Sequence, residues 1–160
     1  MKRIVIVTGP PELEAHPDLR AWAHLLLHRL LAFDLWRTEV YGRMSNPAEL
    51  WAHHMARTCG HHVTDYRLDG VRWSTREEIT EWCYGGEATL YEASQQLAFV
   101  VDHYLGLGSI VELHQLVIEG VEYHDPLVPM LERLGVRVVS EMAPMPPGFG
   151  GFGGLVPCWP

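Results

Sequence analysis

The sequence Arg3-Ile4-Val5-Ile6-Val7-Thr8 decides the predicted fold. It is a continuous run of mainly β-branched apolar residues, and the turn-forming residues Gly9 and Pro10 close it. Such a run is typical of a strand that is buried on both faces, as in the parallel sheet of an α/β protein. We therefore predict that residues 3–8 form the first and central strand of a sheet covered by helices.

Signals for helices and strands alternate along the rest of the chain. Asn46 is a predicted N-cap with Pro47 at the first helical position, and Gly60 and Gly135 are predicted helix stops. The expected elements are a helix from Pro17 to about Leu30, a strand at 38–41, a helix from Pro47 to about Cys59, a strand at 62–68, helical turns at 74–82 that resume after Gly86, a strand at 97–102, a helix at 110–117, a helix that starts at Asp125-Pro126 and ends near Gly135, and a strand at 136–139. This alternation predicts a three-layer Rossmann-like α/β fold with a mainly parallel sheet of about five strands.

Chain length and composition favour one domain. The chain has 160 residues, of which 48% are hydrophobic, enough for one core and too few for two full domains. We assign residues 1–140 to the domain and the Pro/Gly-rich residues 141–160 to a C-terminal tail. No targeting segment or membrane span is visible, and three widely spaced cysteines fit a reducing, cytoplasmic location.

The charge and motif patterns exclude several classes of function. The net charge is -8 and the twelve Lys and Arg residues are scattered, so we expect no nucleic acid partner. The ten histidines do not have the spacing of a metal site. The sequence also lacks a Walker loop, a GxSxG elbow and a dinucleotide fingerprint after the first strand. We expect neither a metal nor a cofactor.

Three predicted loops offer a place for a ligand, because ligands of open parallel sheets bind outside the carboxyl ends of strands. They follow the first strand, the second strand and the strand predicted at 97–102. The candidate ligand-binding residues in these loops are Thr8, Gly9, Gly42, Arg43, Asp102, Gly106, Gly108 and Ser109.

The stretch Gly106-Leu107-Gly108-Ser109 is the most informative of the three. The glycines allow a ligand to approach the backbone, and Ser109 can cap a helix and bind a phosphate oxygen. Glu112 then falls in the first turn of the predicted helix. Each feature also has a purely structural explanation. Residues 106–109 could be an ordinary glycine loop with a serine cap, and Glu112 could be an acidic residue placed favourably against the helix dipole.

The order of these features resembles the SLOG superfamily, which includes the YspA-like proteins and the lonely guy phosphoribohydrolases. The resemblance covers roughly residues 1–140. Val7-Thr8-Gly9 resembles the family's first Thr-Gly turn, and residues 105–109 with Glu112 resemble its Gly-Gly-x-Gly-Thr loop and following glutamate. Glu49 stands where the family has an aspartate, and it is explained equally well as part of a helix cap.

The resemblance implies that the chain binds a nucleotide or nucleotide-derived small molecule at the carboxyl ends of the strands, as a sensing or binding domain. It implies, as an alternative, an N-glycosidase of phosphoribohydrolase or deoxyribosyltransferase type with Glu112 as the catalytic carboxylate. The family's arginine before the fourth strand is missing, and Arg43 or Arg76 could replace it. Members of the family self-associate through their helices, and the Trp- and Leu-rich helical faces predicted here are compatible with a homodimer. A third alternative is a protein-interaction adaptor or inhibitor with a vestigial pocket.

Overall fold

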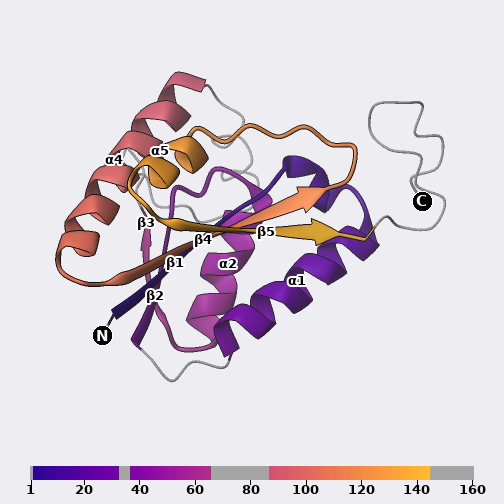
Figure 1. The fold of residues 1–160 in the computed structure, drawn as a ribbon. Coiled ribbons are helices and arrows are strands. Elements are labelled where there is room, and N and C mark those ends of the chain that lie inside the picture. Colours follow the sequence, from indigo (N-terminus) through magenta and orange to yellow (C-terminus); the bar gives the residue numbers. More distant parts are fainter. Residues whose placement is uncertain (1, 33–36, 66–86, 145–160) are drawn as a thin grey trace.

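The β-branched run at the N-terminus forms strand β1 (Lys2–Thr8), and β1 lies at the centre of the sheet as predicted (Figure 1). The computed structural model describes residues 2–32, 37–65 and 87–144. The strand order is β3-β2-β1-β4-β5, and every neighbouring pair is parallel. The predicted α/β fold with a parallel sheet of about five strands is therefore confirmed.

Strands and helices alternate along the described parts of the chain. The other strands are β2 (Arg37–Gly42), β3 (His62–Asp65), β4 (Ile110–Ile118) and β5 (Arg137–Ala143). The helices are η1 (Pro11–Glu14), α1 (Pro17–Ala32), α2 (Pro47–Thr58), α4 (Glu87–Gly106) and α5 (Leu127–Arg133). The predicted strand residues 66–68, the helical turns at 74–82, Arg76 and tail residues 145–160 lie outside the described residues.

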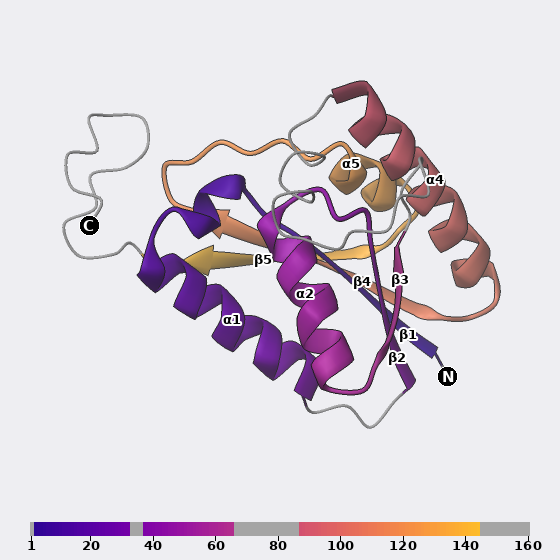
Figure 2. The same cartoon turned by 180° about the vertical axis from the view of Figure 1, so that it is seen from behind.

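Alternate residues of β1 face opposite sides of the sheet and belong to two hydrophobic cores. Val5 and Val7 pack with α1 and α2 on one face, whereas Ile4 and Ile6 pack with α4 and α5 on the other. Figures 1 and 2 show these two pairs of helices on opposite sides of the sheet. Both faces of β1 are covered, which explains why its sequence does not alternate between apolar and polar residues.

The strand predicted at residues 97–102 is wrong, because these residues lie within α4. Ala93, Leu97 and Val101 are fully buried and follow one another at intervals of four, which places them on one face of a helix. Phe99, within the same apolar run, is 77% exposed. A short apolar run does not by itself distinguish a buried strand from a buried stretch of helix.

The helix predicted at residues 110–117 is also wrong, because these residues form β4. Val111 and Leu113 point into the core under α4 and α5, and Leu116 and Ile118 point into the core under α1 and α2. A strand that is apolar on both faces has apolar residues three and four positions apart as well as two positions apart. The helical spacing in this segment was therefore not diagnostic.

A glycine with positive φ follows each of three helices, just before the next strand. Gly60 follows α2, Gly108 follows α4 and Gly135 follows α5, with φ angles of 81°, 84° and 82°. This left-handed conformation is the usual end of a helix that turns into a strand, and it favours glycine. The predicted helix stops at Gly60 and Gly135 are confirmed.

The segment after α4 has the complete hydrogen-bond pattern of a Schellman motif. The amide of Gly108 donates to the carbonyl oxygen of Leu105, and the amide of Ser109 donates to that of Tyr104, both at 3.0 Å. Residues 106–109 are thus the end of a helix before a strand. They are not the strand-to-helix loop that the sequence predicted.

Replacing Gly108 with alanine should lower the free energy of unfolding by about 1 kcal/mol, because an L residue is disfavoured at this φ. Gly106→Ala is the matched control, since Gly106 lies in α4 and both glycines have open space around Cα. This control should leave stability unchanged or raise it by up to about 1 kcal/mol. Urea unfolding measures both changes. Equal losses in the two variants would contradict the assigned helix cap.

Candidate functional site

The residues predicted to bind a ligand lie at two opposite edges of the sheet. Thr8 and Gly9 stand at the end of β1, and Gly42 and Arg43 stand at the end of β2, so these four share the carboxyl edge. Residues 106–109 precede β4, which runs parallel to β1, and therefore lie at the amino edge. The two edges are separated by the length of β1, roughly 20 Å for seven residues.

The other predicted ligand residues do not lie in a loop after a strand, as the sequence had suggested. Asp102 lies on α4, where it lines a surface groove between α4 and α5. Gly106 ends α4, and Gly108 and Ser109 form the cap that follows it. A Cβ at either glycine would meet no described atom within 4 Å. The glycines in this segment are therefore explained by helix termination.

Glu112 lies in β4, so the predicted position in the first turn of a helix is wrong. Its carboxylate accepts a hydrogen bond from Nε of Arg3 at 2.7 Å. Glu112 is paired in register with Val5, three residues before the end of β1. The carboxylate is thus bound to a cation on the sheet face and is separated from the loops at the carboxyl edge.

Gly9 and Gly42 lie at crowded positions of the carboxyl edge. A Cβ at Gly9 would lie 2.8 Å from Cδ1 of Leu13 and 3.1 Å from Cβ of Leu116. A Cβ at Gly42 would lie 2.8 Å from Nε2 of His53. Side chains of the protein itself fill the space beside both glycines, so the glycines alone do not indicate a bound ligand.

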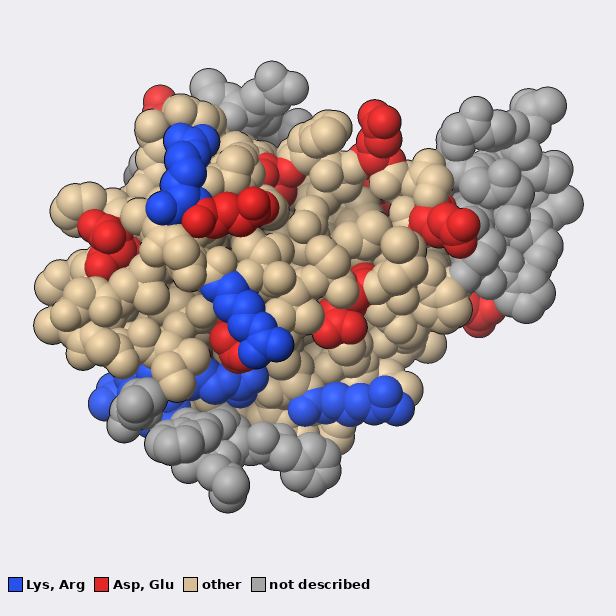
Figure 3. All heavy atoms as spheres, viewed as in Figure 1, with Lys and Arg blue, Asp and Glu red and all other residues tan. Residues whose placement is uncertain are grey.

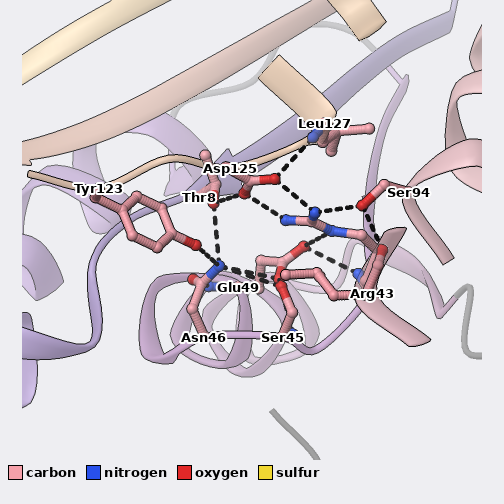
Figure 4. A network of polar contacts seen from close by, with 10 residues as sticks. Thr8, Arg43, Ser45, Asn46, Glu49, Ser94, Tyr123, Asp125 and Leu127 are labelled. Atoms are coloured by element: carbon pink, nitrogen blue, oxygen red, sulfur yellow. Dashed lines mark hydrogen bonds and ion pairs between the residues drawn. The ribbon is translucent and has the colours of Figure 1, made fainter. Parts of the chain in front are cut away.

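The fully buried side chain of Arg43 lies at the centre of the carboxyl edge (Figure 4). Its Nη1 and Nη2 atoms donate to the two carboxylate oxygens of Asp125, each at 2.7 Å. Nε donates to Glu49 at 3.0 Å, and Nη1 also donates to Oγ of Ser94 at 2.8 Å. One guanidinium therefore connects the turn after β2 with α2, α4 and the loop between β4 and α5.

Asp125 joins this loop to β1 and to the start of α5. In addition to Arg43, its carboxylate accepts hydrogen bonds from the hydroxyl of Thr8 and from the amide of Leu127. Burial alone would raise the pKa of Asp125, but the charge of Arg43 and these hydrogen bonds outweigh burial and hold the pKa below its usual range. Asp125 is therefore ionised at neutral pH.

The start of α2 has the N-cap that the sequence predicted. The side chain of Asn46 accepts a hydrogen bond from the amide of Glu49 at 3.0 Å, and Pro47 is the first helical residue. The Glu49 carboxylate accepts from the amides of Arg43 and Ser45 and from the Ser45 hydroxyl. Glu49 thus holds the turn between β2 and α2 in place.

We call this set of polar residues the carboxyl-edge cluster: Thr8, Arg43, Ser45, Asn46, Glu49, Ser94 and Asp125. Its formal charge is -1, because Arg43 is accompanied by two carboxylates. Burial alone would lower the pKa of Arg43, but Asp125 and Glu49 raise it well above its usual range. Each carboxylate oxygen accepts two or more hydrogen bonds. The hydrogen-bonding capacity of both carboxylates is therefore used within the protein.

Sequence reasoning identified Thr8 and Arg43 but missed Ser94, Tyr123 and Asp125. Asp125 was recognised only as the start of a helix, a role it fills by accepting the amide of Leu127. Tyr123 receives a hydrogen bond from Nδ2 of Asn46 at 3.3 Å, and burial raises the pKa of its hydroxyl. These residues come from distant segments, so only the assembled sheet brings them to Arg43.

The carboxyl-edge cluster lies where the strand order of the sheet reverses. From β1 the chain continues outward through β2 and β3 on one side, whereas β4 and β5 lie on the other side. Loops that leave the carboxyl ends of β1 and β4 therefore diverge, which creates a crevice in open α/β sheets. Thr8, the last residue of β1, and Asp125, in the loop after β4, contact each other at this position.

Comparisons with protein-family models, curated proteins and solved structures gave no match. Within residues 2–32, 37–65 and 87–144, no three His, Cys, Asp or Glu side chains gather as metal ligands would. No helix in the described part of the chain has the length and apolar character needed to cross a bilayer. Function is therefore inferred from the geometry of the carboxyl edge.

Replacing Arg43 with methionine should lower the free energy of unfolding by about 3–5 kcal/mol, because two buried carboxylates would lose their cation. Arg37→Met is the matched control, since the Arg37 side chain is 76% exposed and its Nη2 lies 3.7 Å from Glu39. The control should cost less than about 1 kcal/mol. Chemical denaturation measures both variants. Losses of similar size would show that Arg43 is not a central support.

His114 provides a prediction about pH. Its Nε2 is buried with no hydrogen-bond partner among the described residues, and burial lowers its pKa despite the nearby Glu112 carboxylate. The unfolded chain therefore takes up a proton at higher pH than the folded protein does. Stability should fall as pH drops below about 6.5, the ordinary histidine pKa. In His114→Gln, the free energy of unfolding should fall less over the same pH range. An unchanged pH dependence in this variant would show that His114 is not its source.

Proposed function

We propose that the protein binds a nucleotide or nucleotide-derived small molecule at the carboxyl edge of its sheet, as a sensing or binding domain. The observation that carries the proposal is the convergence of polar side chains from β1, the turn before α2, α4 and the loop before α5. They meet at the reversal of strand order, the position at which open α/β sheets hold their ligands.

In this proposal the carboxyl-edge cluster supports the ligand-binding loops and does not itself supply charge to the ligand. Arg43 is fully buried, and its donors are directed at Asp125, Glu49 and Ser94. Its positive charge is balanced within the protein and is not available to a phosphate. A rigid support of this kind holds neighbouring backbone groups in one geometry, which lowers the entropic cost of binding.

The geometry favours binding over catalysis. Cleavage of an N-glycosidic bond needs a carboxyl group that can exchange a proton or approach the sugar. Asp125 and Glu49 are saturated with hydrogen bonds, and Glu112 is ion-paired with Arg3 on the sheet face. The N-glycosidase alternative therefore lacks support from the arrangement of these three acids. An adaptor function is the remaining alternative if nucleotides do not bind.

An NMR titration with adenosine monophosphate and with ADP-ribose tests this proposal. Amide shifts should move most at residues 8–9, 42–46 and 119–125, which surround the carboxyl edge. Residues 106–109 at the amino edge are an internal control and should move little. Bound nucleotide should also raise the melting temperature.

Two outcomes would overturn the proposal. One is the absence of any shift at millimolar nucleotide, which would favour the adaptor alternative. The other is a set of shifts centred on residues 106–109. Free base appearing in the NMR sample would instead support catalysis, and the Glu112→Gln variant would then show whether Glu112 is responsible.

A further inference from the structure

Strand β5 (Arg137–Ala143) is the last strand of the sheet, and no described strand pairs with its outer edge. Among the described residues it pairs with β4 alone, through seven consecutive residues. Figure 1 shows β5 at the front of the molecule, and no described helix lies over its outer edge. An open edge presents unpaired backbone groups and is a template for pairing with another strand. The other outer strand, β3, has four described residues.

The charged residues of β5 are arranged symmetrically about its centre. Arg137 and Glu141 lie two residues before and two residues after Val139, so all three side chains share one face of the strand. Figure 3 shows basic and acidic side chains together on the face of the molecule that carries β5. Met142 at the end of the strand is 60% exposed, an apolar surface that a partner strand would partly cover.

We propose that two copies of the chain associate by antiparallel pairing of their β5 strands, centred on Val139. A two-fold axis through this position places Arg137 of each copy opposite Glu141 of the other. Unlike charges directly opposite each other stabilise an antiparallel pair, and like charges destabilise it. The two central Val139 side chains would lie side by side between these ion pairs.

The sign and position of the charges favour a second copy of β5 over an unrelated peptide as the partner strand. Charges that prevent edge pairing work by repulsion or by being buried without a partner. The charges on β5 have opposite signs and equal distances from Val139, so the strand is complementary to itself. A shift of two residues in either direction would remove both pairs, which also selects one register. This surface differs from the helical faces that the family resemblance implied.

Charge reversal on the full chain tests the proposal by analytical ultracentrifugation. The native protein should be a dimer, and Arg137→Glu or Glu141→Arg should each raise the dissociation constant about tenfold or more. The double variant should restore the dimer. An equimolar mixture of the two single variants should also form dimers, because every opposed pair is again unlike. Arg133→Glu makes the same charge change on α5 and should leave the dimer intact.

The restoration arms distinguish lost pairing from lost folding, because misfolded single variants would not form a mixed dimer. A native protein that is monomeric at all accessible concentrations would overturn the proposal. So would a dimer that tolerates charge reversal on β5. A dimer that is weakened by Arg133→Glu instead would place the interface at the groove between α4 and α5, which Arg133 lines.

Discussion

The bidentate ion pair between Arg43 and Asp125 determines the geometry of the carboxyl edge. It joins the turn after β2 to the loop after β4, two segments 82 residues apart in the sequence. Apolar side chains of similar volume often stabilise a buried site as well as an ion pair does. The ion pair also fixes the relative orientation of the two segments, because Nη1 and Nη2 of Arg43 must each meet one carboxylate oxygen of Asp125. Thr8, Glu49 and Ser94 then have fixed places around it.

The fold class could be predicted because β1 and most of the helix ends carry strong local signals. The segment around residue 108 was predicted wrongly because Gly108 was not interpreted as a helix stop, although the same signal was recognised at Gly60 and Gly135. Gly60, Gly108 and Gly135 all end helices with the same left-handed conformation, yet only the first and last were interpreted so. Segments 97–102 and 110–117 are apolar at almost every position, and local periodicity does not decide between helix and strand in such segments.

That single exchange of helix and strand also changed the predicted site. A glycine loop after a strand lies at the carboxyl edge, whereas one before a strand lies at the amino edge, so the exchange moved residues 106–109 across the whole sheet. Thr8 and Arg43 were placed correctly because the first two strands were placed correctly. Their partners Ser94 and Asp125 could not be found from the sequence, since no local pattern reports a contact between distant segments.

The proposed ligand site and the proposed dimer surface are connected by one continuous segment. Asp125 accepts the amide of Leu127, the first residue of α5, and α5 leads through Gly135 into Arg137 at the start of β5. The segment is short and well packed, with Leu127, Leu131 and Val136 in the core beneath α4 and α5. This segment is a continuous packed path between the two proposed sites, and coupling through it requires that ligand binding shifts the loop at Asp125. Thermodynamic linkage makes such an effect reciprocal, so pairing of β5 would change ligand affinity by the same factor.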